Sequence, residues 1–381
     1  MKKLVINGKI LSPKRLPEGT AILIERDRIR AIDQLGNFPQ DIETLDAGGK
    51  WVTPGLIDIH VHGGAGSDTM DRGAKALKAM SRFFATTGVT SFLPTTGAAT
   101  NEDITASIQG VDAFAHPADG ARVLGIHLEG PYLGYEHKGA QPEQHLREAQ
   151  PDEYRPWLES GLVKLFTVAP DVEGVLALIE TGRELGVRFA VGHTSATYDQ
   201  MMQAIDHGLT QATHTFNGMP QLHHREPGVI GAILTDERVY AQVIADGVHI
   251  HPAVIKLLFI AKGVRRTVLI TDAIRAAGAE DGRHTLGDQV IYVEDGIART
   301  KSGSLAGSTL TMDQALENAC QFTGQSLEDI LPSATSVPAE SLGLDHQIGT
   351  LAPGYLADLV ILDDDFRPHL TIIGGQVAYQ K

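Results

Sequence analysis

The sequence contains a single cysteine, Cys320, among 381 residues. One thiol cannot form a disulfide within the chain, and it cannot supply a zinc site made of cysteine ligands, so both features are excluded. Cys320 falls in the segment 312–322, whose composition is typical of a helix. We therefore interpret it as a buried apolar residue rather than as a nucleophile.

Long hydrophobic runs and positive charge are also scarce. The chain has no run of about 18 apolar residues, so we expect no membrane-spanning helix. The apolar run 4–6 near the start ends at Asn7, which is too short for a signal peptide, and we expect a cytoplasmic protein. Lys and Arg number 32 against 47 Asp and Glu, which gives a net charge of −15. Such a surface repels nucleic acid and anionic membranes, so neither is an expected partner.

The two ends of the chain have the same character. Residues 1–53 contain short apolar segments such as 21–25, separated by turn-forming residues, and residues 343–381 contain similar segments such as 356–362. Neither end alone has enough strands to form a stable core. We therefore expect residues 1–53 plus 343–381 to pair in one small β-sandwich domain that brings the termini together.

Residues 54–342 alternate between apolar segments that favour strands and amphipathic segments that favour helices. The candidate strands are 56–62, 89–95, 122–129, 163–169, 188–193, 210–215, 240–246 and 267–272. The candidate helices include 71–87, 173–186 and 196–207, and in the second of these Val175, Leu178, Ile179 and Leu185 are expected on one buried face. Eight strands with interleaved helices predict an α/β fold, the (β/α)₈ TIM-like barrel, whose active sites lie at the C-terminal ends of the strands.

Side chains that can bind metals stand at the ends of five of these strands. They are His60, His62, Glu129, His193, His214 and Asp272. His60 and His62 lie two residues apart, so on a strand both point to the same face, as does Asp58. Each of these residues taken alone is more commonly a histidine of the hydrophobic core or a carboxylate that caps a helix. Those explanations do not account for all of the residues standing at one rim of a barrel. Imidazole and carboxylate without thiolate favour a catalytic divalent ion such as Zn, Fe, Mn or Co.

Several short motifs resemble those of a known family. Residues 54–63, PGLIDIHVHG, resemble the signature of the amidohydrolase superfamily. Within it, residues 127–131, 192–194, 214–219 and 271–273 (HLEGP, GHT, HTFNGM and TDA) resemble the N-acetylglucosamine-6-phosphate deacetylase family. The resemblance covers nearly the whole chain. It implies a metal-dependent enzyme that hydrolyses the N-acetyl amide of this phosphorylated amino sugar to glucosamine 6-phosphate and acetate.

The resemblance also implies an arrangement of the metal ligands. Glu129, His193 and His214 would hold one ion, as in every member of the family. His60 and His62 would hold a second ion, with Glu129 bridging the two. Some members have Gln in place of the second histidine and keep one ion, whereas this chain has both histidines, so we predict two ions per subunit. Asp272 would lie near the ions and the attacking water and act as the catalytic base and then the acid.

A set of substrate-binding residues follows from the same resemblance. It comprises Gln141, Asn217, Gly218, Arg225, His249 and Ala306. Asn217 and the N–H of Gly218 match the phosphate grip of the family, and the guanidinium fork of Arg225 suits a phosphate. Related enzymes are dimers, so we expect a homodimer in which Arg225 can reach the neighbouring site. Gln141 replaces a histidine found near the acetyl group in some members, and Ala306 belongs to a loop expected to close over the sugar.

Two rival enzyme classes lack their required residues in this sequence. A dihydroorotase or hydantoinase needs a lysine at the end of the fourth strand, but Lys164 lies near the start of that strand. A nucleoside deaminase needs a glutamate shortly after a strand-end histidine, but Asn217 stands three residues after His214. Deacetylation of N-acetylgalactosamine 6-phosphate stays open because that sugar differs at one hydroxyl group. A non-catalytic scaffold of the same ancestry is a remote alternative.

Overall fold

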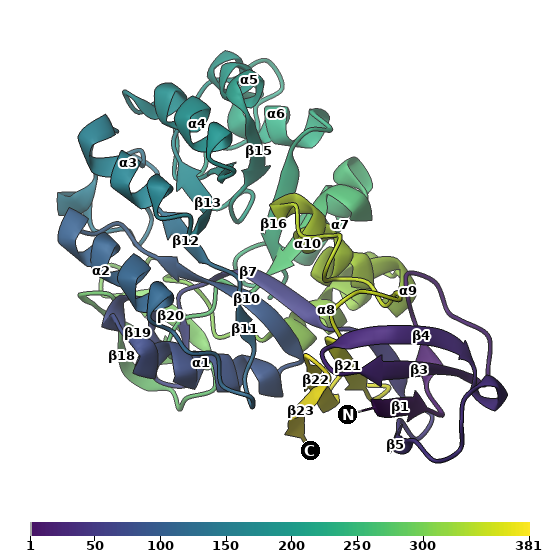
Figure 1. Cartoon of the computed structure of the whole chain (residues 1–381). Coiled ribbons are helices and arrows are strands. Elements are labelled where there is room, and N and C mark those ends of the chain that lie inside the picture. The colour runs from purple at the N-terminus through teal and green to yellow at the C-terminus, as the bar shows by residue number, and fades with distance from the viewer. Residues whose placement is uncertain (1) are drawn as a thin grey trace.

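The computed structural model describes residues 2–381, and Met1, the first residue of the expected small domain, lies outside the described residues. Its centre is a nearly closed barrel of eight parallel strands surrounded by helices (Figure 1). In order around the barrel the strands are β7 (Leu56–Val61), β10 (Val89–Thr96), β12 (Ile126–Glu129), β13 (Val163–Val168), β14 (Arg188–Val191), β15 (Leu209–Ala212), β16 (Tyr240–Ile244) and β17 (Thr267–Ile270). The expected TIM-like barrel is confirmed.

The first and last barrel strands meet just beyond their C-terminal ends. The N–H of Asp272 donates a hydrogen bond to the carbonyl of His60 over 3.0 Å, and the N–H of His62 donates to the carbonyl of Ala273 over 2.8 Å. In this fold helices cover the outside of the parallel strands, and all six residues of β7 are buried, including the polar residues Asp58 and His60. Barrel closure therefore places the residues at the ends of β7 and β17 next to one another.

The helices follow the strands in the order expected of this fold. They are α1 (Ala74–Thr86), α2 (Asn101–Asp112), α3 (Pro151–Glu159), α4 (Val175–Glu184), α5 (Tyr198–His207), α6 (Gly228–Thr235), α7 (Pro252–Lys262) and α8 (Met312–Thr323), with the short α9 (Leu327–Ile330) and α10 (Ser336–Leu342) after them. Local sequence explains several helix starts, because Pro151 and Pro252 occupy first-turn positions and Thr197 forms a capping box with Gln200. Cys320 lies buried in α8, as expected.

Two expectations about individual elements were wrong. Leu185 is 48% exposed, while Val175, Leu178 and Ile179 are fully buried. The cause is that α4 ends at Glu184, so Leu185 leaves the helical period. The candidate strand 122–129 is divided into β11 (Arg122–Val123) and β12, because the chain turns at Gly125. A Cβ atom there would lie 2.5 Å from the carbonyl oxygen of Leu162, and its φ of +143° favours glycine.

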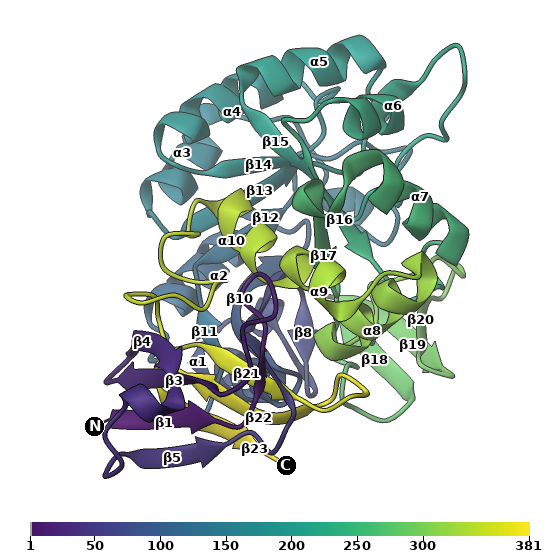
Figure 2. The same cartoon turned by 90° about the vertical axis from the view of Figure 1, so that its right-hand side faces the viewer.

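Strands from both ends of the chain form two further sheets beside the barrel (Figure 2). One contains β1 (Lys2–Ile6), β3 (Thr20–Glu25), β4 (Arg28–Gln34) and β5 (Glu43–Asp46). The other contains β2 (Lys9–Ile10), β6 (Trp51–Pro54), β21 (Leu359–Leu362), β22 (Pro368–Ile373) and β23 (Gln376–Gln380). Ile22 and Ile24 of the first sheet share a hydrophobic cluster with Leu359 and Ile361 of the second, so the two sheets pack face to face.

A three-stranded antiparallel sheet that we did not predict follows β17. Its strands are β18 (Gly282–Leu286), β19 (Gln289–Glu294) and β20 (Ile297–Thr300). The side chain of Gln289 donates a hydrogen bond to the carbonyl of Ala140 over 2.8 Å, which ties this sheet to the loop after β12. Within residues 2–381, the structure has no helix with the length and apolar character needed to cross a membrane.

Candidate active site

The predicted metal ligands converge at the C-terminal ends of the barrel strands. Glu129 is the last residue of β12, whereas His193, His214 and Asp272 each stand two residues beyond the end of a strand. At these three positions the backbone φ is +48°, +29° and +52°, a region that residues other than glycine rarely adopt. Such backbone strain costs roughly 1–3 kcal/mol per residue and is concentrated at functional sites. The chain thus turns sharply to aim each side chain into the barrel mouth.

The first group of ligands consists of Glu129, His193 and His214. Oε1 of Glu129 lies 3.2 Å from Nε2 of His193 and 3.0 Å from Nε2 of His214. The two imidazole nitrogens are 3.1 Å apart. All three side chains are buried. They form one compact set of three ligand atoms.

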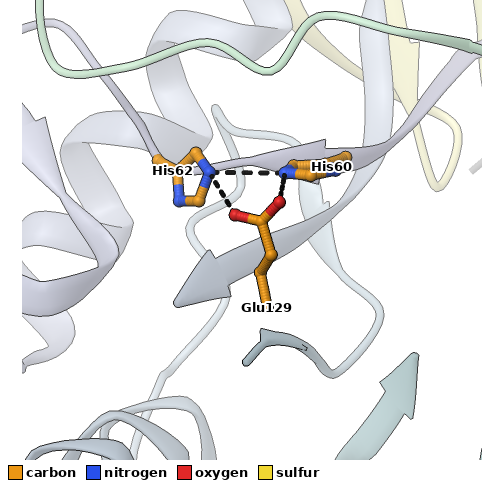
Figure 3. Close-up of side chains that lie close together, drawn as sticks. All are labelled: His60, His62 and Glu129. Atoms are coloured by element: carbon orange, nitrogen blue, oxygen red, sulfur yellow. Dashed lines mark hydrogen bonds and ion pairs between the residues drawn. The ribbon is translucent and has the colours of Figure 1, made fainter. Parts of the chain in front are cut away.

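The second group consists of His60, His62 and Glu129 (Figure 3). Both histidines come from the end of β7 and turn their Nε2 atoms, 3.3 Å apart, toward the carboxylate of Glu129. Oε2 of Glu129 lies 3.2 Å from Nε2 of His62, and Oε1 lies 3.7 Å from Nε2 of His60. Oδ1 of Asp272 lies 3.3 Å from Nε2 of His60 and 3.2 Å from Nε2 of His62. Glu129 therefore belongs to both groups, and Asp272 adjoins the second.

The first group fits a divalent cation chemically. Nδ1 of His193 lies 2.9 Å from the carbonyl of His137, and Nδ1 of His214 lies 3.1 Å from the carbonyl of Asn217. A carbonyl only accepts hydrogen bonds, so both Nδ1 atoms carry the proton and, in the neutral ring, both Nε2 atoms offer lone pairs. The two Nε2 atoms lie 3.0–3.2 Å from Oε1 of Glu129, toward which their lone pairs point. Ligand atoms on one tetrahedral zinc lie about 3.3–3.6 Å apart. The two Nε2 atoms and the carboxylate oxygen are almost this far apart already, so a cation could bind between them with little movement of the side chains.

The ionisation of this cluster shows the competition between protons and a cation. Burial alone raises the pKa of Glu129, but the neighbouring imidazoles, His60 first among them, outweigh burial and hold this pKa well below its ordinary value. Burial alone lowers the pKa of His193, but its contact with Glu129 outweighs that effect and raises the pKa. Protons thus bind where a cation would bind, so metal affinity is expected to rise with pH.

Asp58 is a buried residue beside the predicted ligands, and no role was expected for it from the sequence. It is fully buried, and it accepts hydrogen bonds from the hydroxyl of Thr271 over 2.6 Å and from the N–H of His60 over 3.3 Å. Burial raises the pKa of Asp58 to about 7. It joins β7 to the segment that carries Asp272, and so it holds the two sides of the site together. The strand alternation placed Asp58 on the ligand face, but its partner was visible only after closure of the barrel.

The predicted ligands His62, Glu129, His193, His214 and Asp272 line a cavity of about 400 Å³, and His60 does not. Four of the predicted substrate-binding residues line it, namely Gln141, Asn217, Gly218 and His249. Two others do not. Arg225 is exposed on the loop before α6, with its guanidinium 2.7 Å from Nε2 of His224. Ala306 is fully buried against Ile274 and Ile291, while its neighbours Leu305 and Gly307 face the cavity.

The cavity also has a charged rim that the sequence analysis missed. Arg275 lies 2.8 Å from a carboxylate oxygen of Asp71, and Arg72 lies 2.8 Å from one of Asp103. All four residues line the cavity. In the sequence, the one indication of this charged rim was that Arg275 stands three residues after Asp272. Since both arginines are already paired with carboxylates, neither offers an uncommitted positive charge to a substrate anion.

His249 is held by a partly buried ion pair with Asp246. Its Nδ1 lies 2.6 Å from a carboxylate oxygen of Asp246, and the side chain is 7% exposed. Burial alone lowers the pKa of His249, but the bond to Asp246 outweighs burial and raises it, while Asp246 has a lowered pKa. A histidine whose pKa is raised by folding stabilises the folded state at pH values below its unfolded pKa of about 6.5. That stabilisation is lost as the pH rises through the higher pKa of the folded state. An aspartate whose pKa is lowered by folding stabilises the folded state at pH values above its unfolded pKa of about 3.9. The ion pair of Asp246 and His249 therefore stabilises the fold most between about pH 4 and 6.5.

We predict that Asp246→Asn lowers the pKa of His249, because burial then acts without the compensating carboxylate. The measurement is an NMR titration of the histidine ring protons in the metal-free protein. The exposed Asp119→Asn, whose residue pairs with Arg82 on the surface, serves as the control and should leave this titration unchanged. An unaltered His249 titration in Asp246→Asn would show that the pair is not formed in solution.

Comparisons with known proteins agree with this geometry. The model of the amidohydrolase family matches residues 51–378. An N-acetylglucosamine-6-phosphate deacetylase of Vibrio furnissii is 38% identical over 376 residues, which cover 97% of this chain and 94% of that protein. An N-acetylgalactosamine-6-phosphate deacetylase of Escherichia coli O157:H7 is 39% identical over 343 residues, 89% of this chain and 91% of that protein. A mutant N-acetyl-D-glucosamine-6-phosphate deacetylase of Mycobacterium smegmatis, solved in complex with N-acetyl-D-glucosamine-6-phosphate, has a TM-score of 0.92 at 34% identity, with complete coverage of both chains.

Proposed function

The chain belongs to the amidohydrolase family, and within that family we propose that it hydrolyses the N-acetyl group of N-acetylglucosamine 6-phosphate to glucosamine 6-phosphate and acetate. The observation that carries this proposal is the carboxylate of Glu129, shared by two groups of histidines in one cavity. The relatives named above act on N-acetylhexosamine 6-phosphates, and they match nearly the whole of this chain.

The family is metal-dependent, and we propose two divalent ions per subunit, from among Zn, Fe, Mn and Co. The first would be held by Glu129, His193 and His214, and the second by His60, His62 and the same glutamate. Such ions polarise an amide carbonyl and lower the pKa of water toward 7. The donors are nitrogen and oxygen atoms only, which suits these metals and does not distinguish among them.

Asp272 is the residue we propose for proton transfer. It is buried at the mouth of the barrel, and Oδ1 lies 3.2–3.3 Å from the histidines of the second group. Burial alone raises the pKa of Asp272, but the neighbouring imidazoles outweigh burial and lower it, so the carboxylate is ionised and can accept a proton. It would take the proton from the attacking water and return it to the departing amine nitrogen, which then leaves as a neutral amine.

The phosphate would bind at the side of the cavity formed by Asn217, Gly218 and His249. The side-chain amide of Asn217 donates to the carbonyl of His249 over 3.2 Å, so the two segments are held together. Gly218 has a φ of +64°, and a Cβ atom there would lie 2.8 Å from Nδ1 of His193. Because Arg225 lies outside the cavity of its own chain, we propose a homodimer in which it completes the site of the partner subunit.

The division of the chain into a barrel and a small β-domain agrees with the roles proposed for the site residues. We propose that residues 54–342 form the catalytic barrel and that residues 1–53 plus 343–381 form the small β-domain. The hydrogen-bonded pairing of β6 with β21 across more than 300 residues supports a domain made from both ends. Every residue proposed here for catalysis or for binding falls inside the barrel segment.

A substrate series tests the proposed function. We predict that removal of the 6-phosphate lowers kcat/KM about 100-fold, since each hydrogen bond to a charged group contributes about 1.5–3 kcal/mol. The assay measures release of the free amine from N-acetylglucosamine 6-phosphate, N-acetylgalactosamine 6-phosphate and the two unphosphorylated sugars. The galactosamine epimer is the second candidate, because a relative named for it is as similar as those named for the glucosamine form. Equal rates with and without phosphate would contradict the assigned phosphate site.

A further inference from the structure

Gln141 lines the cavity beside the shared glutamate, Glu129. It is 8% exposed, and it stands in the loop after β12, twelve residues beyond Glu129. Its side-chain Nε2 donates a hydrogen bond to Oε2 of Glu129 over 2.7 Å. Its Oε1 accepts a hydrogen bond from the N–H of Ala98 over 2.8 Å. The amide of Gln141 is therefore bonded at both ends to the protein.

The backbone of the neighbouring strand fixes the direction of this amide. The N–H of Ala98 can only donate, so it selects the oxygen of Gln141 and turns the nitrogen toward the carboxylate. Ala98 follows the end of β10 and is itself 4% exposed. Gly97 leaves the room for this arrangement, since a Cβ atom there would lie 3.3 Å from Oε1 of Gln141. The donor that faces Glu129 is thus set by the barrel and does not depend on a substrate.

The two oxygens of Glu129 have different nearest neighbours, although Nε2 of His60 lies 3.7 Å from Oε1. Oε1 lies 3.0–3.2 Å from the Nε2 atoms of His193 and His214. Oε2 lies 3.2 Å from Nε2 of His62 and receives the hydrogen bond from Gln141. A carboxylate that offers one oxygen to each side would serve both groups at once, and in this orientation Oε1 faces His193 and His214 while Oε2 faces His62. Rotation about the last side-chain bond would change which oxygen faces each group.

We propose that Gln141 is a positioning residue that holds Glu129 in the bridging orientation, and that the ion at His60 and His62 depends on it more than the ion at His193 and His214. This inference rests on the proposed function, because it assumes that two ions bind. The sequence placed Gln141 among the expected substrate-binding residues, and this proposal gives it a role that acts through Glu129. A group that orients a metal ligand in this way commonly changes metal affinity by 10- to 100-fold.

The test is Gln141→Met, which keeps the length of the side chain and removes its donor. Metal-free wild-type and variant proteins are titrated with Co²⁺, and binding is followed by visible absorption and by calorimetry. We expect one of the two ions to bind the variant about 10- to 100-fold more weakly, with the other nearly unchanged. A fall in kcat with little change in KM should accompany this loss. Gln211→Met is the matched control, because Gln211 is also buried and its amide bonds to Ser341 and Gln242, outside the ligand set.

Each outcome of this titration has a definite meaning. Two ions bound by Gln141→Met with wild-type affinity, together with a raised KM, would overturn the inference and make Gln141 a substrate contact. Wild-type protein that binds no ion would instead contradict the proposed function. Circular dichroism and thermal unfolding of the metal-free variant establish that it folds, and Gln141→Asn, whose shorter side chain cannot span Ala98 and Glu129, gives a second variant with the same expected loss.

Discussion

Asp272→Asn is expected to reduce kcat by about 10²- to 10⁴-fold, the range that general acid–base catalysis contributes. The amide of asparagine cannot accept the proton of the attacking water, and it cannot return a proton to the amine. The substitution conserves volume in a position where φ is +52° and where Asn tolerates the left-handed region well. We therefore expect the variant to fold, and to bind substrate and at least one metal ion.

The measurement combines steady-state kinetics with metal analysis on the same protein sample. Asp119→Asn repeats the substitution on an exposed residue, 52% of whose side chain is accessible, and should keep wild-type turnover. If Asp272→Asn lost both turnover and all of its metal, Asp272 would be needed for metal binding. The loss of turnover would then not demonstrate proton transfer by Asp272. Turnover equal to that of the wild type would contradict the assigned role.

Glu129→Gln is expected to remove both metal ions and all hydrolysis, whereas His62→Gln is expected to remove one ion and leave a measurable rate. The reason is that Glu129 belongs to both groups of ligands and His62 to one. An amide is a weaker ligand than a carboxylate, and the neutral side chain leaves the buried imidazoles without their counter-charge. Metal-to-protein ratios after dialysis measure the difference, with about two ions expected in the wild type, about one in His62→Gln and fewer in Glu129→Gln.

Metal removal supplies the complementary experiment. Treatment with a chelator should abolish hydrolysis by the wild type, and added divalent ions should restore it. His346→Gln, a substitution at an exposed histidine away from the cavity, should match the wild type in metal content and rate. Equal metal content in His62→Gln and Glu129→Gln would contradict a shared glutamate. A hydrolytic rate that survives complete removal of metal would contradict the mechanism as a whole.

The barrel was predicted correctly from the sequence, and the predicted ligands lie together in the structure, because the relevant signals are local. Apolar segments bounded by polar turns mark each strand, and His60 and His62 are both on β7 or beside its end. Local signals fail where an element ends, as at Leu185, and where a strand is interrupted, as at Gly125. The sheet of β18 to β20 was missed for a related reason, since its strands are short and partly exposed and their apolar pattern is weak.

Residue types and their spacing along the chain were enough to predict the barrel class and a set of nitrogen and oxygen donors suited to a divalent ion, because periodicity and ligand chemistry belong to single segments. The division of Glu129 between two groups, the bond from Gln141, the partner of Asp58 and the exposed place of Arg225 could be known only from the folded chain. The contacts of Glu129 and Asp58 depend on atoms from segments far apart in the sequence. Closure of the barrel brings those atoms within 4 Å of one another, and no pattern within one segment records such a distance.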